Sequence, residues 1–316
     1  MQQAQLQEGI KTAAIHPHPQ RRSGVNVFRQ MQAFSFTVPA LVLLVIFLVY
    51  PICYVVYLSF QRWNLLGTPK FIGLQNYHTI FFVDPSFLQS VGVTVLFVIL
   101  AVPTQVLLGL FMAILIEDDF RGRTFFRTVF FVPMVISFVA AGITFEWMFS
   151  TGANIGLFPQ LFANIGLVFP DWQHSNGFMA MIMVVIMNTW KSAGFSMILY
   201  LAGLQSISPD LYEAASIDGI SNGWQKFRFI SWPLLAPTTT LLIITNTIGS
   251  FQAFTPFLVM TNGGPSGATS SIIFYIYNTF ATRTGVASAA ATFFLIVVLI
   301  ITAVQLMVSR RQESVY

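Results

Sequence analysis

Three polar side chains that could bind a polar solute lie inside long apolar stretches of the sequence, namely Asn188, Asn246 and Ser250. Asn246 and Ser250 are four residues apart, which puts them on one face if their segment is helical. A polar group inside an apolar element is costly to bury, so it is a candidate for binding or transport. Asn and Ser also bridge neighbouring helices, and the sequence leaves both interpretations open.

Lys191 is a base within one of these apolar stretches. Its ammonium could bind an anionic solute or pair with Glu146 in a neighbouring apolar stretch, and a structural or gating role is favoured. Aromatic rings and amides that touch a solute are also common packing residues. The weaker candidates for the same site are therefore Trp190, Gln252, Ser137 and Phe251.

Catalytic and metal-binding patterns are absent from the sequence. There is no GxxxxGK[ST] phosphate loop, no HExxH pair and no recognisable Ser/His/Asp set. His16 and His18 stand between prolines with no further ligand nearby, so they indicate a solvated tail rather than a metal site. The chain is therefore not expected to be an enzyme.

The composition indicates an integral membrane protein. Of 316 residues, 55% are hydrophobic and only 8% are charged, and the mean hydropathy is +0.73. A soluble domain of this size could not cover so much apolar surface with so few charges. Membrane helices of about 20 residues must hold these polar candidates. Six spans are predicted, at about 34–60, 88–116, 125–149, 178–204, 234–260 and 286–308.

Lysine and arginine lie mostly beside alternate ends of these spans, and the positive-inside rule places such flanks in the cytoplasm. Both termini are therefore predicted to be cytoplasmic. The cytoplasmic flanks carry Lys11, Arg21, Arg22, Arg29, Arg121, Arg123, Arg127, Lys226, Arg228, Arg310 and Arg311, whereas the opposite flanks carry only Arg62, Lys70 and Arg283. No basic face with interleaved aromatic residues indicates binding to nucleic acid.

The domain organisation follows from the spans. We expect a mobile cytoplasmic tail over residues 1–33, a transmembrane domain over residues 34–308 and a short cytoplasmic tail over residues 309–316. Cys53 is the only cysteine and cannot form an internal disulfide.

Residues 213–233, EAASIDGISNGWQKFRFISWP, are polar and interrupt the apolar pattern. Ser208 and Pro209 predict the start of a short helix, and Gly219 predicts its end because glycine readily takes the left-handed conformation. Asn222 is then a second cap, and Pro233 is expected to redirect the chain into the fifth span. The segment is predicted to be a cytoplasmic helix-turn-helix, and an interfacial helix pair on lipid is the alternative explanation.

This segment resembles the EAA loop of permease subunits in bacterial ATP-binding-cassette (ABC) importers, in particular the carbohydrate-uptake class that includes maltose and glycerol-phosphate systems. Similar motifs occur in the same order along about residues 34–311. They are FIGLQNYHTIF, RGRTFFRTVFFVP, NTWKSAGF, LAGLQSISPDLYEAA, EAASIDG, QKFRFISWPLLAP and TNGGP. The loop differs from the family in having one more residue between Gly219 and Ile230, and in Trp232 where Leu is common.

The resemblance implies an all-α, polytopic fold of the type I importer permease, with six transmembrane helices and a cytoplasmic coupling helix-turn-helix over residues 205–233. It implies that this loop docks on an ATPase subunit. The docking residues would be Glu213, Ala214, Ala215, Asp218 and Gly219. ATP and Mg²⁺ would then bind only the partner ATPases, and this chain would hold no cofactor.

The same resemblance implies a bacterial plasma-membrane complex of this chain with a second, related permease, two ATPase subunits and an extracytoplasmic solute-binding protein. In the family, the region of TNGGP lies near where that binding protein docks. Asn188, Asn246 and Ser250 resemble positions that line the sugar site of maltose permeases, but Ala253 replaces a polar amide of that pattern. The solute could be a sugar, a polyol or a glycerol phosphate.

Two other classes of protein remain as alternatives. A secondary, ion-coupled transporter would also be a helical bundle, but the sequence lacks an internal repeat and the polar loop would be unexplained. A membrane-embedded enzyme would need catalytic residues at a membrane face, and none is found.

Overall fold

The computed structural model describes residues 37–151, 155–172, 176–220 and 222–313, and side chains up to Ser309. The whole predicted N-terminal tail, with His16 and His18, lies outside these residues, as does His174. Residues up to Tyr54 belong to one compact unit and residues from Val55 onward to a second. The helix Thr37–Ser59 contains one π-helical turn, η1 (Val45–Val49), followed by α3 (Tyr50–Ser59).

Within the described residues, four helices are long and apolar enough to cross a membrane: Thr37–Ser59, α5 (Pro85–Leu115), α9 (Gly177–Gln205) and residues Thr284–Ser309 of α16 (Thr284–Glu313). Two further helix pairs each make one span if they are counted together, which allows up to six spans. These features confirm the prediction of an all-α polytopic protein. The number of spans is six if each of the two bent pairs crosses the membrane as one span.

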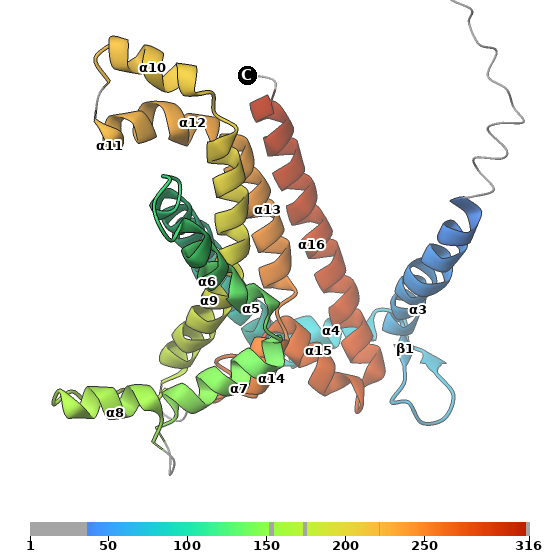
Figure 1. Ribbon diagram of the computed structural model, residues 1–316. Helices are drawn as coiled ribbons and strands as arrows, with labels where there is room; N and C mark the ends of the chain where they lie inside the picture. Colours follow the sequence, from blue (N-terminus) through green and yellow to red (C-terminus); the bar gives the residue numbers. More distant parts are fainter. Residues whose placement is uncertain (1–36, 152–154, 173–175, 221, 314–316) are drawn as a thin grey trace, which may run out of the picture. The chain divides into compact units, whose positions relative to one another are not determined.

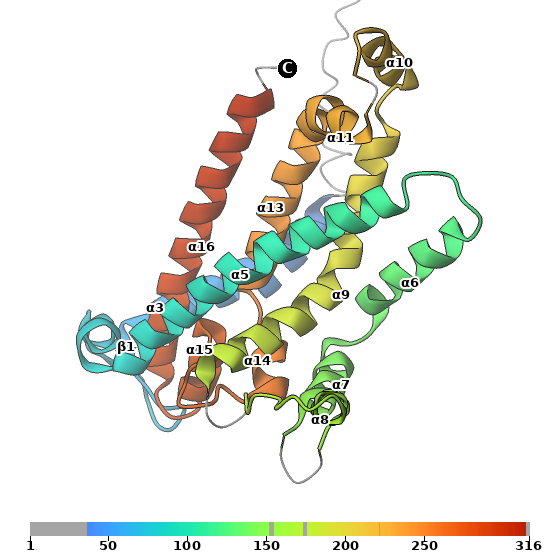
Figure 2. The same cartoon turned by 90° about the vertical axis from the view of Figure 1, so that its left-hand side faces the viewer.

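The helices α5 and α9 form the centre of the second unit, and α5 runs obliquely along α9 and α13 (Ala236–Phe251) (Figure 2). Asp84 caps α5 by accepting from the backbone N–H of Ser86, and Asn176 caps α9 in the same way. A Cβ built on Gly109 of α5 would lie 2.4 Å from Cβ of Ser196 in α9. Glycine is therefore required at this position for the two backbones to cross.

The third predicted span, at about 125–149, is broken into two helices. The helix α6 (Arg123–Val135) ends beyond Pro133, and α7 (Phe138–Phe149) leaves it at an angle of 99°. Ile136 and Ser137 are extended, and the Ser137 hydroxyl accepts from the backbone N–H of Val139. Hydropathy could not detect this break because apolar residues continue through it.

The fifth predicted span, 234–260, is also interrupted. The helical run α11 (Gly223–Lys226), η3 (Phe227–Ser231) and α12 (Trp232–Leu234) bends by 63° into α13. The bend lies at Leu235 rather than at Pro233 as predicted, because Pro237 occupies the first turn of the new helix. The chain then breaks at residues 252–254 before α14 (Thr255–Met260).

Short elements at one end of the second unit complete the fold. These are the two-stranded antiparallel hairpin β1 (Gln61–Arg62) and β2 (Lys70–Phe71), α4 (Gln75–His78), η2 (Thr79–Val83), α8 (Leu157–Asn164) and α15 (Ile272–Phe280). The hairpin was not predicted, because two residues per strand carry no periodic signal. The Asn76 side chain donates to the backbone carbonyls of Ser59 and Gln61, each at 2.8 Å, and so holds the hairpin base.

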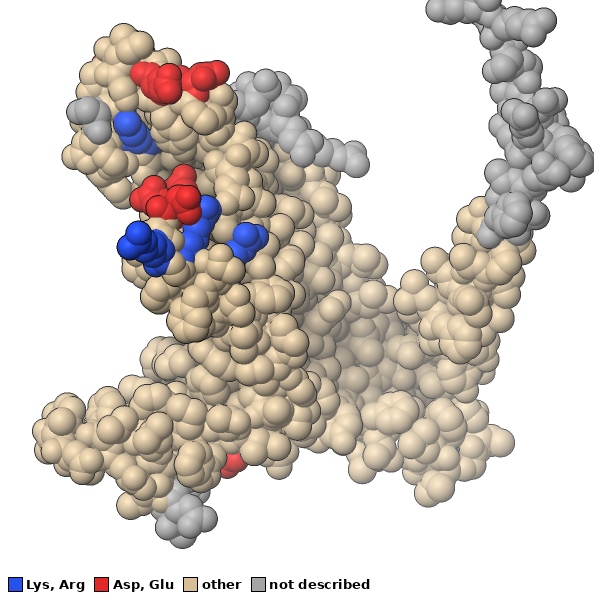
Figure 3. Space-filling model, in the orientation of Figure 1, with Lys and Arg blue, Asp and Glu red and all other residues tan. Residues whose placement is uncertain are grey.

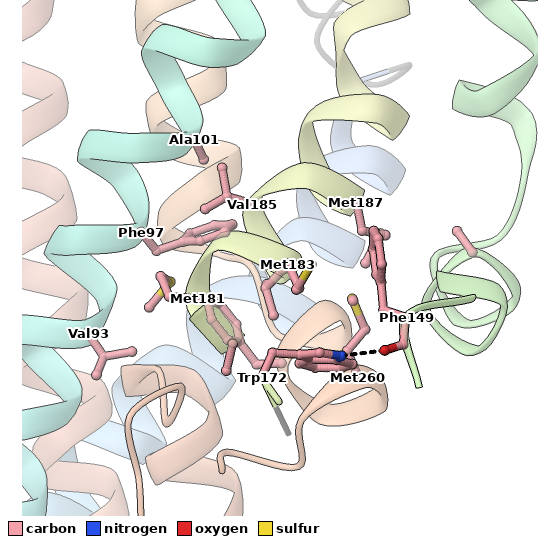
Figure 4. Packing of buried hydrophobic residues seen from close by; sticks show 14 residues of the cluster. Val93, Phe97, Ala101, Phe149, Trp172, Met181, Met183, Val185, Met187 and Met260 are labelled. Atoms are coloured by element: carbon pink, nitrogen blue, oxygen red, sulfur yellow. Dashed lines mark hydrogen bonds between the residues drawn. The ribbon is translucent and has the colours of Figure 1, made fainter. Parts of the chain in front are cut away.

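Buried side chains gather where the two interrupted spans approach α5 and α9. Phe97 of α5 packs edge-on against Phe257 of α14, with ring centroids 4.8 Å apart. Trp172 is fully buried, and its indole N–H donates to the Phe149 carbonyl at 2.7 Å (Figure 4). The core therefore includes Phe149 of α7 and Phe257 of α14, so the helices that follow the two interruptions pack against α5 and α9.

Candidate functional site

A cavity of about 260 Å³ lies where the two interrupted spans meet α9. It is lined by Phe138, Asn188, Gly249, Gln252, Ala253, Phe254, Thr255 and Pro256. Phe138 begins α7, and Gln252, Ala253 and Phe254 form the break between α13 and α14. Helix breaks leave backbone groups without intrahelical partners and expose side chains at angles that a straight helix does not offer.

Two of the predicted solute-binding residues, Asn188 and Gln252, lie on this cavity wall. Asn188 is only 5% exposed, and within the described residues its amide makes no side-chain hydrogen bond. The fully buried side-chain atoms without a partner among the described residues belong to Gln105, Ser250 and Gln305, so the Asn188 amide is not sealed in the core and reaches the cavity. Asn188 is therefore free to bind a solute group or a water molecule.

Asn246 and Ser250 do share one face of α13, as their spacing predicts, and both are buried. The Asn246 amide donates to the Ser196 hydroxyl of α9 at 3.1 Å, so Asn246 bridges two helices. The Ser250 hydroxyl has no hydrogen-bond partner among the described residues. Neither residue lines the cavity, which favours the structural interpretation for Asn246.

The remaining predicted candidates lie around the cavity rather than on it. Ser137 is next to the lining residue Phe138 and caps α7. The Trp190 ring packs 5.1 Å from that of Phe145 and is 38% exposed. Phe251 is buried, with its ring 6.3 Å from that of Phe294.

Lys191 lies at the break between α6 and α7. Its ammonium donates to the backbone carbonyls of Met134 at 3.0 Å, Pro133 at 3.5 Å and Ile136. It also lies 4.4 Å from the ring centroid of Phe138. The predicted alternative of an ion pair with Glu146 is not formed within the described residues.

Sequence reasoning missed Phe138, Gly249, Phe254, Thr255 and Pro256 as cavity residues. The predicted fifth span, at about 234–260, also runs through Ala253, whereas the helix α13 ends at Phe251. Pro256 was the available signal, because a proline after an apolar run often marks the first turn of a new helix.

The polar segment between α9 and α13 forms two short helices, as predicted. The helix α10 (Pro209–Ile217) is capped by Ser208, whose hydroxyl accepts from the backbone N–H of Asp210. Gly219 has φ of +88°, and the backbone N–H of Ile220 donates to the Ala215 carbonyl at 2.8 Å. This is the geometry of a Schellman cap, which needs a left-handed residue at the position of Gly219.

The two short helices are joined by a hydrogen bond of 2.9 Å between the hydroxyls of Tyr212 and Ser231. Glu213, Ala214, Asp218 and Gly219 are exposed, whereas Ala215 is buried and faces the chain itself. The large apolar residue Ile217 is 87% exposed. Figure 3 shows that charged side chains gather over this end of the second unit. The C-terminal end of α16 lies at the same end in Figure 1.

The opposite end of the second unit carries an ion pair that was not predicted. Arg283 Nη2 lies 2.9 Å from Asp84 Oδ2, and the Tyr275 hydroxyl donates to the same oxygen at 3.0 Å. Burial opposes ionisation of Asp84, but these hydrogen bonds and the Arg283 charge outweigh it and lower the pKa of Asp84 below its usual value. Burial and the Asp84 charge raise the pKa of Tyr275 to about 12.

A larger cavity of about 570 Å³ lies at this same end, between the β1–β2 hairpin and the start of α16, and it is lined in part by Arg62, Lys70 and Arg283. It contains none of the predicted solute-binding residues. The smaller cavity at the two helix breaks is therefore the better candidate site, since its wall carries the Asn188 amide, which makes no side-chain hydrogen bond within the described residues.

Comparisons with known proteins bear on this architecture. The profile of the family described as the binding-protein-dependent transport system inner membrane component matches residues 105–314. The lactose transport system permease protein LacF of Rhizobium radiobacter is 34% identical over 81% of this chain and 86% of its own length. The sn-glycerol-3-phosphate transport system permease protein UgpA of Agrobacterium fabrum is 32% identical over 82% of this chain and 87% of its own length.

Among solved structures, a bacterial ABC transporter involved in import of the acidic polysaccharide alginate shares the fold. The TM-score is 0.78 with 24% sequence identity, over 90% of this chain and 97% of the other. A secondary transporter is not favoured by these matches. The chain belongs to the family of inner-membrane components of binding-protein-dependent transport systems, and is a permease subunit of an ABC importer, not an enzyme.

Proposed function

We propose that this chain forms one half of the translocation pathway for a sugar or a related polyol or glycerol phosphate. The observation that carries the proposal is the cavity at the two helix breaks, with the unpaired Asn188 amide on its wall. Relatives whose names specify lactose and sn-glycerol-3-phosphate transport support this class of solute.

The chemistry of the cavity suits a neutral, hydroxylated solute. Asn188 and Gln252 each offer amide donors and acceptors, while Phe138 and Phe254 offer rings for the apolar face of a sugar. The lining contains no Lys, Arg or His, and the nearby Lys191 ammonium is already bound to backbone carbonyls. We therefore favour a sugar or polyol over a phosphate ester.

The cavity volume supports a shared pathway. Pockets for small molecules commonly enclose about 300–1,000 Å³, and this cavity of about 260 Å³ is slightly smaller. A second, related permease that faces it would enlarge the site, as expected for a heterodimer. The solute would then pass between the two subunits.

The segment of residues 205–233 is proposed to couple transport to ATP hydrolysis on two separate ATPase subunits, which would bind ATP and Mg²⁺. Glu213 and Asp218 can meet bases of a partner, and the small Ala214 permits close approach. The exposed Ile217 adds an apolar contact that is costly to leave in water. Ala215 contributes by packing α10 against its own chain rather than by direct docking.

The orientation is proposed from the distribution of bases. Arg121 precedes α6, and Arg123 and Arg127 lie in its first turns. The start of α6 points toward the end of the unit that carries α10 and the C-terminal part of α16 (Figure 1). Arg62, Lys70 and Arg283 line the cavity at the opposite end. By the positive-inside rule the first end is cytoplasmic, with both termini, and residues 34–308 form the membrane domain of a bacterial plasma-membrane protein.

The extracytoplasmic end is the proposed docking face for a solute-binding protein. TNGGP forms a turn, in which the backbone N–H of Gly264 donates to the Thr261 carbonyl at 2.8 Å and Gly263 has φ of +80°. A rigid turn at the surface loses little conformational freedom when a partner binds.

The test is purification of this chain from its native membranes in mild detergent, followed by identification of its partners and uptake assays in proteoliposomes. We expect a Walker-motif ATPase, a second permease and ATP-dependent uptake of a neutral sugar or polyol. Recovery of the chain alone, without ATP-dependent uptake of any solute, would reject the proposal. Uptake of phosphate esters only would reject the preference for a neutral solute.

A further inference from the structure

The break in the third span creates an electrostatic problem that Lys191 solves. The last carbonyl groups of any helix lack intrahelical partners, and the dipole makes this end negative. The carbonyls of Pro133, Met134 and Ile136 lie at this end of α6, within an apolar stretch in which Pro133 is buried but Met134 and Val135 are exposed. Carbonyls left without partners there would be costly, because hydrocarbon offers no donor.

The approach of α6 to α9 is built for this contact. A Cβ on Gly194 would lie 2.5 Å from the Phe130 carbonyl oxygen, so only glycine admits the α6 backbone at that distance. Lys191 precedes Gly194 by three residues and therefore lies on the same face of α9. The glycine brings the end of α6 close, and the ammonium binds its carbonyls.

The same ammonium connects the break to the cavity. It lies 4.4 Å from the centroid of the Phe138 ring, which suits a cation–π contact. Phe138 is the first residue of α7 and lines the cavity together with Asn188, which precedes Lys191 by three residues on α9. One side chain therefore contacts both sides of a 99° bend and a ring of the cavity wall.

We propose that Lys191 is a positioning residue of the permease, whose ammonium caps the end of α6, holds the bend between α6 and α7 and so sets Phe138 on the cavity wall. Lys191 acts through this bend and does not contact the solute. The inference deepens the proposed function, since it assigns a role in shaping the same cavity. It also predicts which substitutions are tolerated.

Substitutions of Lys191 by arginine and by methionine distinguish the effect of its charge from the effect of its packing. Lys191→Arg keeps a cation with several N–H donors, so it should still bind the carbonyls. Lys191→Met keeps the length and apolar stem but removes every donor. Lys191→Gln keeps two donors without charge and should be intermediate. Thr189→Val is the matched control. Thr189 is on the same helix as Lys191, and the substitution removes its hydrogen bond of 3.0 Å to Thr104 of α5 but leaves the carbonyl cap intact.

The bend can be measured directly in the full complex. Spin labels at Thr124, near the start of α6, and at Trp147, near the end of α7, report the angle between the two helices in a Cys53→Ser background. We expect one narrow distance distribution in the parent protein, in Thr189→Val and in Lys191→Arg. We expect a broader or shifted distribution in Lys191→Met and a partial change in Lys191→Gln.

Transport is measured on the same samples as uptake against the concentration of solute-loaded binding protein. We expect Lys191→Met to lower the maximal rate about tenfold with its half-saturating concentration changed less than twofold, and Lys191→Arg to restore the rate to within about threefold. A misshapen cavity acts after the binding protein has docked, so it should lower the maximal rate more than it changes the half-saturating concentration of the binding protein.

Three results would overturn the proposal. The first is an unchanged distance distribution in Lys191→Met, and the second is a changed distribution in Lys191→Met with full transport. The third is a restored distance distribution in Lys191→Arg without restored transport, which would indicate that Lys191 contacts the solute directly. If the parent complex takes up no solute, the proposed function is rejected but the role of Lys191 in the bend is not, because the distance measurement does not depend on uptake. If Lys191→Met does not assemble, Lys191→Gln and Lys191→Arg still provide the comparison.

Discussion

Arg283 and Asp84 are 199 residues apart in the sequence, yet their side chains form an ion pair of 2.9 Å. Asp84 also caps α5, and Arg283 directly precedes α16, so the pair joins the starts of two membrane helices. Tyr275 donates to the same carboxylate oxygen. This end of the second unit is therefore held by charge as well as by packing.

The pH dependence of stability should report this pair. Because the pKa of Asp84 is lowered in the folded protein, its stabilising contribution is present above the ordinary aspartate pKa and is lost as pH falls through the folded value. We expect the unfolding temperature in detergent to drop more steeply at acidic pH for the parent than for Asp84→Asn. Asparagine still caps α5, and the exposed position of Arg283 limits the effect to about 1 kcal/mol. Identical pH profiles would contradict the prediction.

Gly219→Asp should uncouple ATP hydrolysis from transport while the protein still reaches the membrane. At φ of +88° any residue with a side chain is strained by about 1–2 kcal/mol, so the cap between α10 and α11 would be distorted. The measurement is solute-stimulated ATP hydrolysis by the purified complex, together with recovery of the ATPase in a pull-down.

Gly223→Ala is the matched control for Gly219→Asp. Gly223 begins α11 without a left-handed backbone, and a Cβ there meets no atom within 4 Å. This variant should keep coupling near that of the parent. Normal uptake by Gly219→Asp would reject the coupling role of the segment.

Asn188 and Asn246 should behave differently, although both are buried amides. Asn188→Ala should lower solute uptake by about 3- to 10-fold without loss of stability, since its amide is free within the described structure. The comparison is uptake rate against the unfolding midpoint of the same sample. Uptake unchanged in the double variant Asn188→Ala, Asn246→Ala would remove both residues from the solute pathway.

Asn246→Ala should instead destabilise the protein by about 1 kcal/mol, because it breaks the bridge to Ser196. Ser196→Ala removes the same hydrogen bond, so the two substitutions should not add in the double variant. Chemical unfolding of the four proteins in detergent measures this coupling. Additive effects would show that the bridge carries no stability.

Gly194→Ala should separate α6 from α9. The added methyl group would overlap the Phe130 carbonyl oxygen, which is backbone and cannot turn aside. We expect a loss of about 1–3 kcal/mol in unfolding free energy. Gly92→Ala is the control, because Gly92 lies in α5 with open space at its Cβ. This control should be neutral or slightly stabilising, and equal effects of the two variants would argue against the close crossing.

The sequence by itself determined the membrane class, the approximate limits of the unbroken spans and the polar segment between α9 and α13. These properties are local. A run of apolar residues requires a helix in lipid, and Ser208, Gly219 and Asn222 cap their helices through neighbouring backbone groups. The family motifs lie in the same order as their elements, so the fold class was predictable as well.

Only the tertiary structure decided the site. Apolar residues continue through both helix breaks, and a break is stable only if another helix satisfies the exposed carbonyls, as Lys191 does for α6. The same dependence on distant partners explains why Asn246 bridges to Ser196 while Asn188 faces a cavity. Local composition sets where a chain can cross a membrane, whereas the packing of one helix against another sets where it bends and which polar groups stay free.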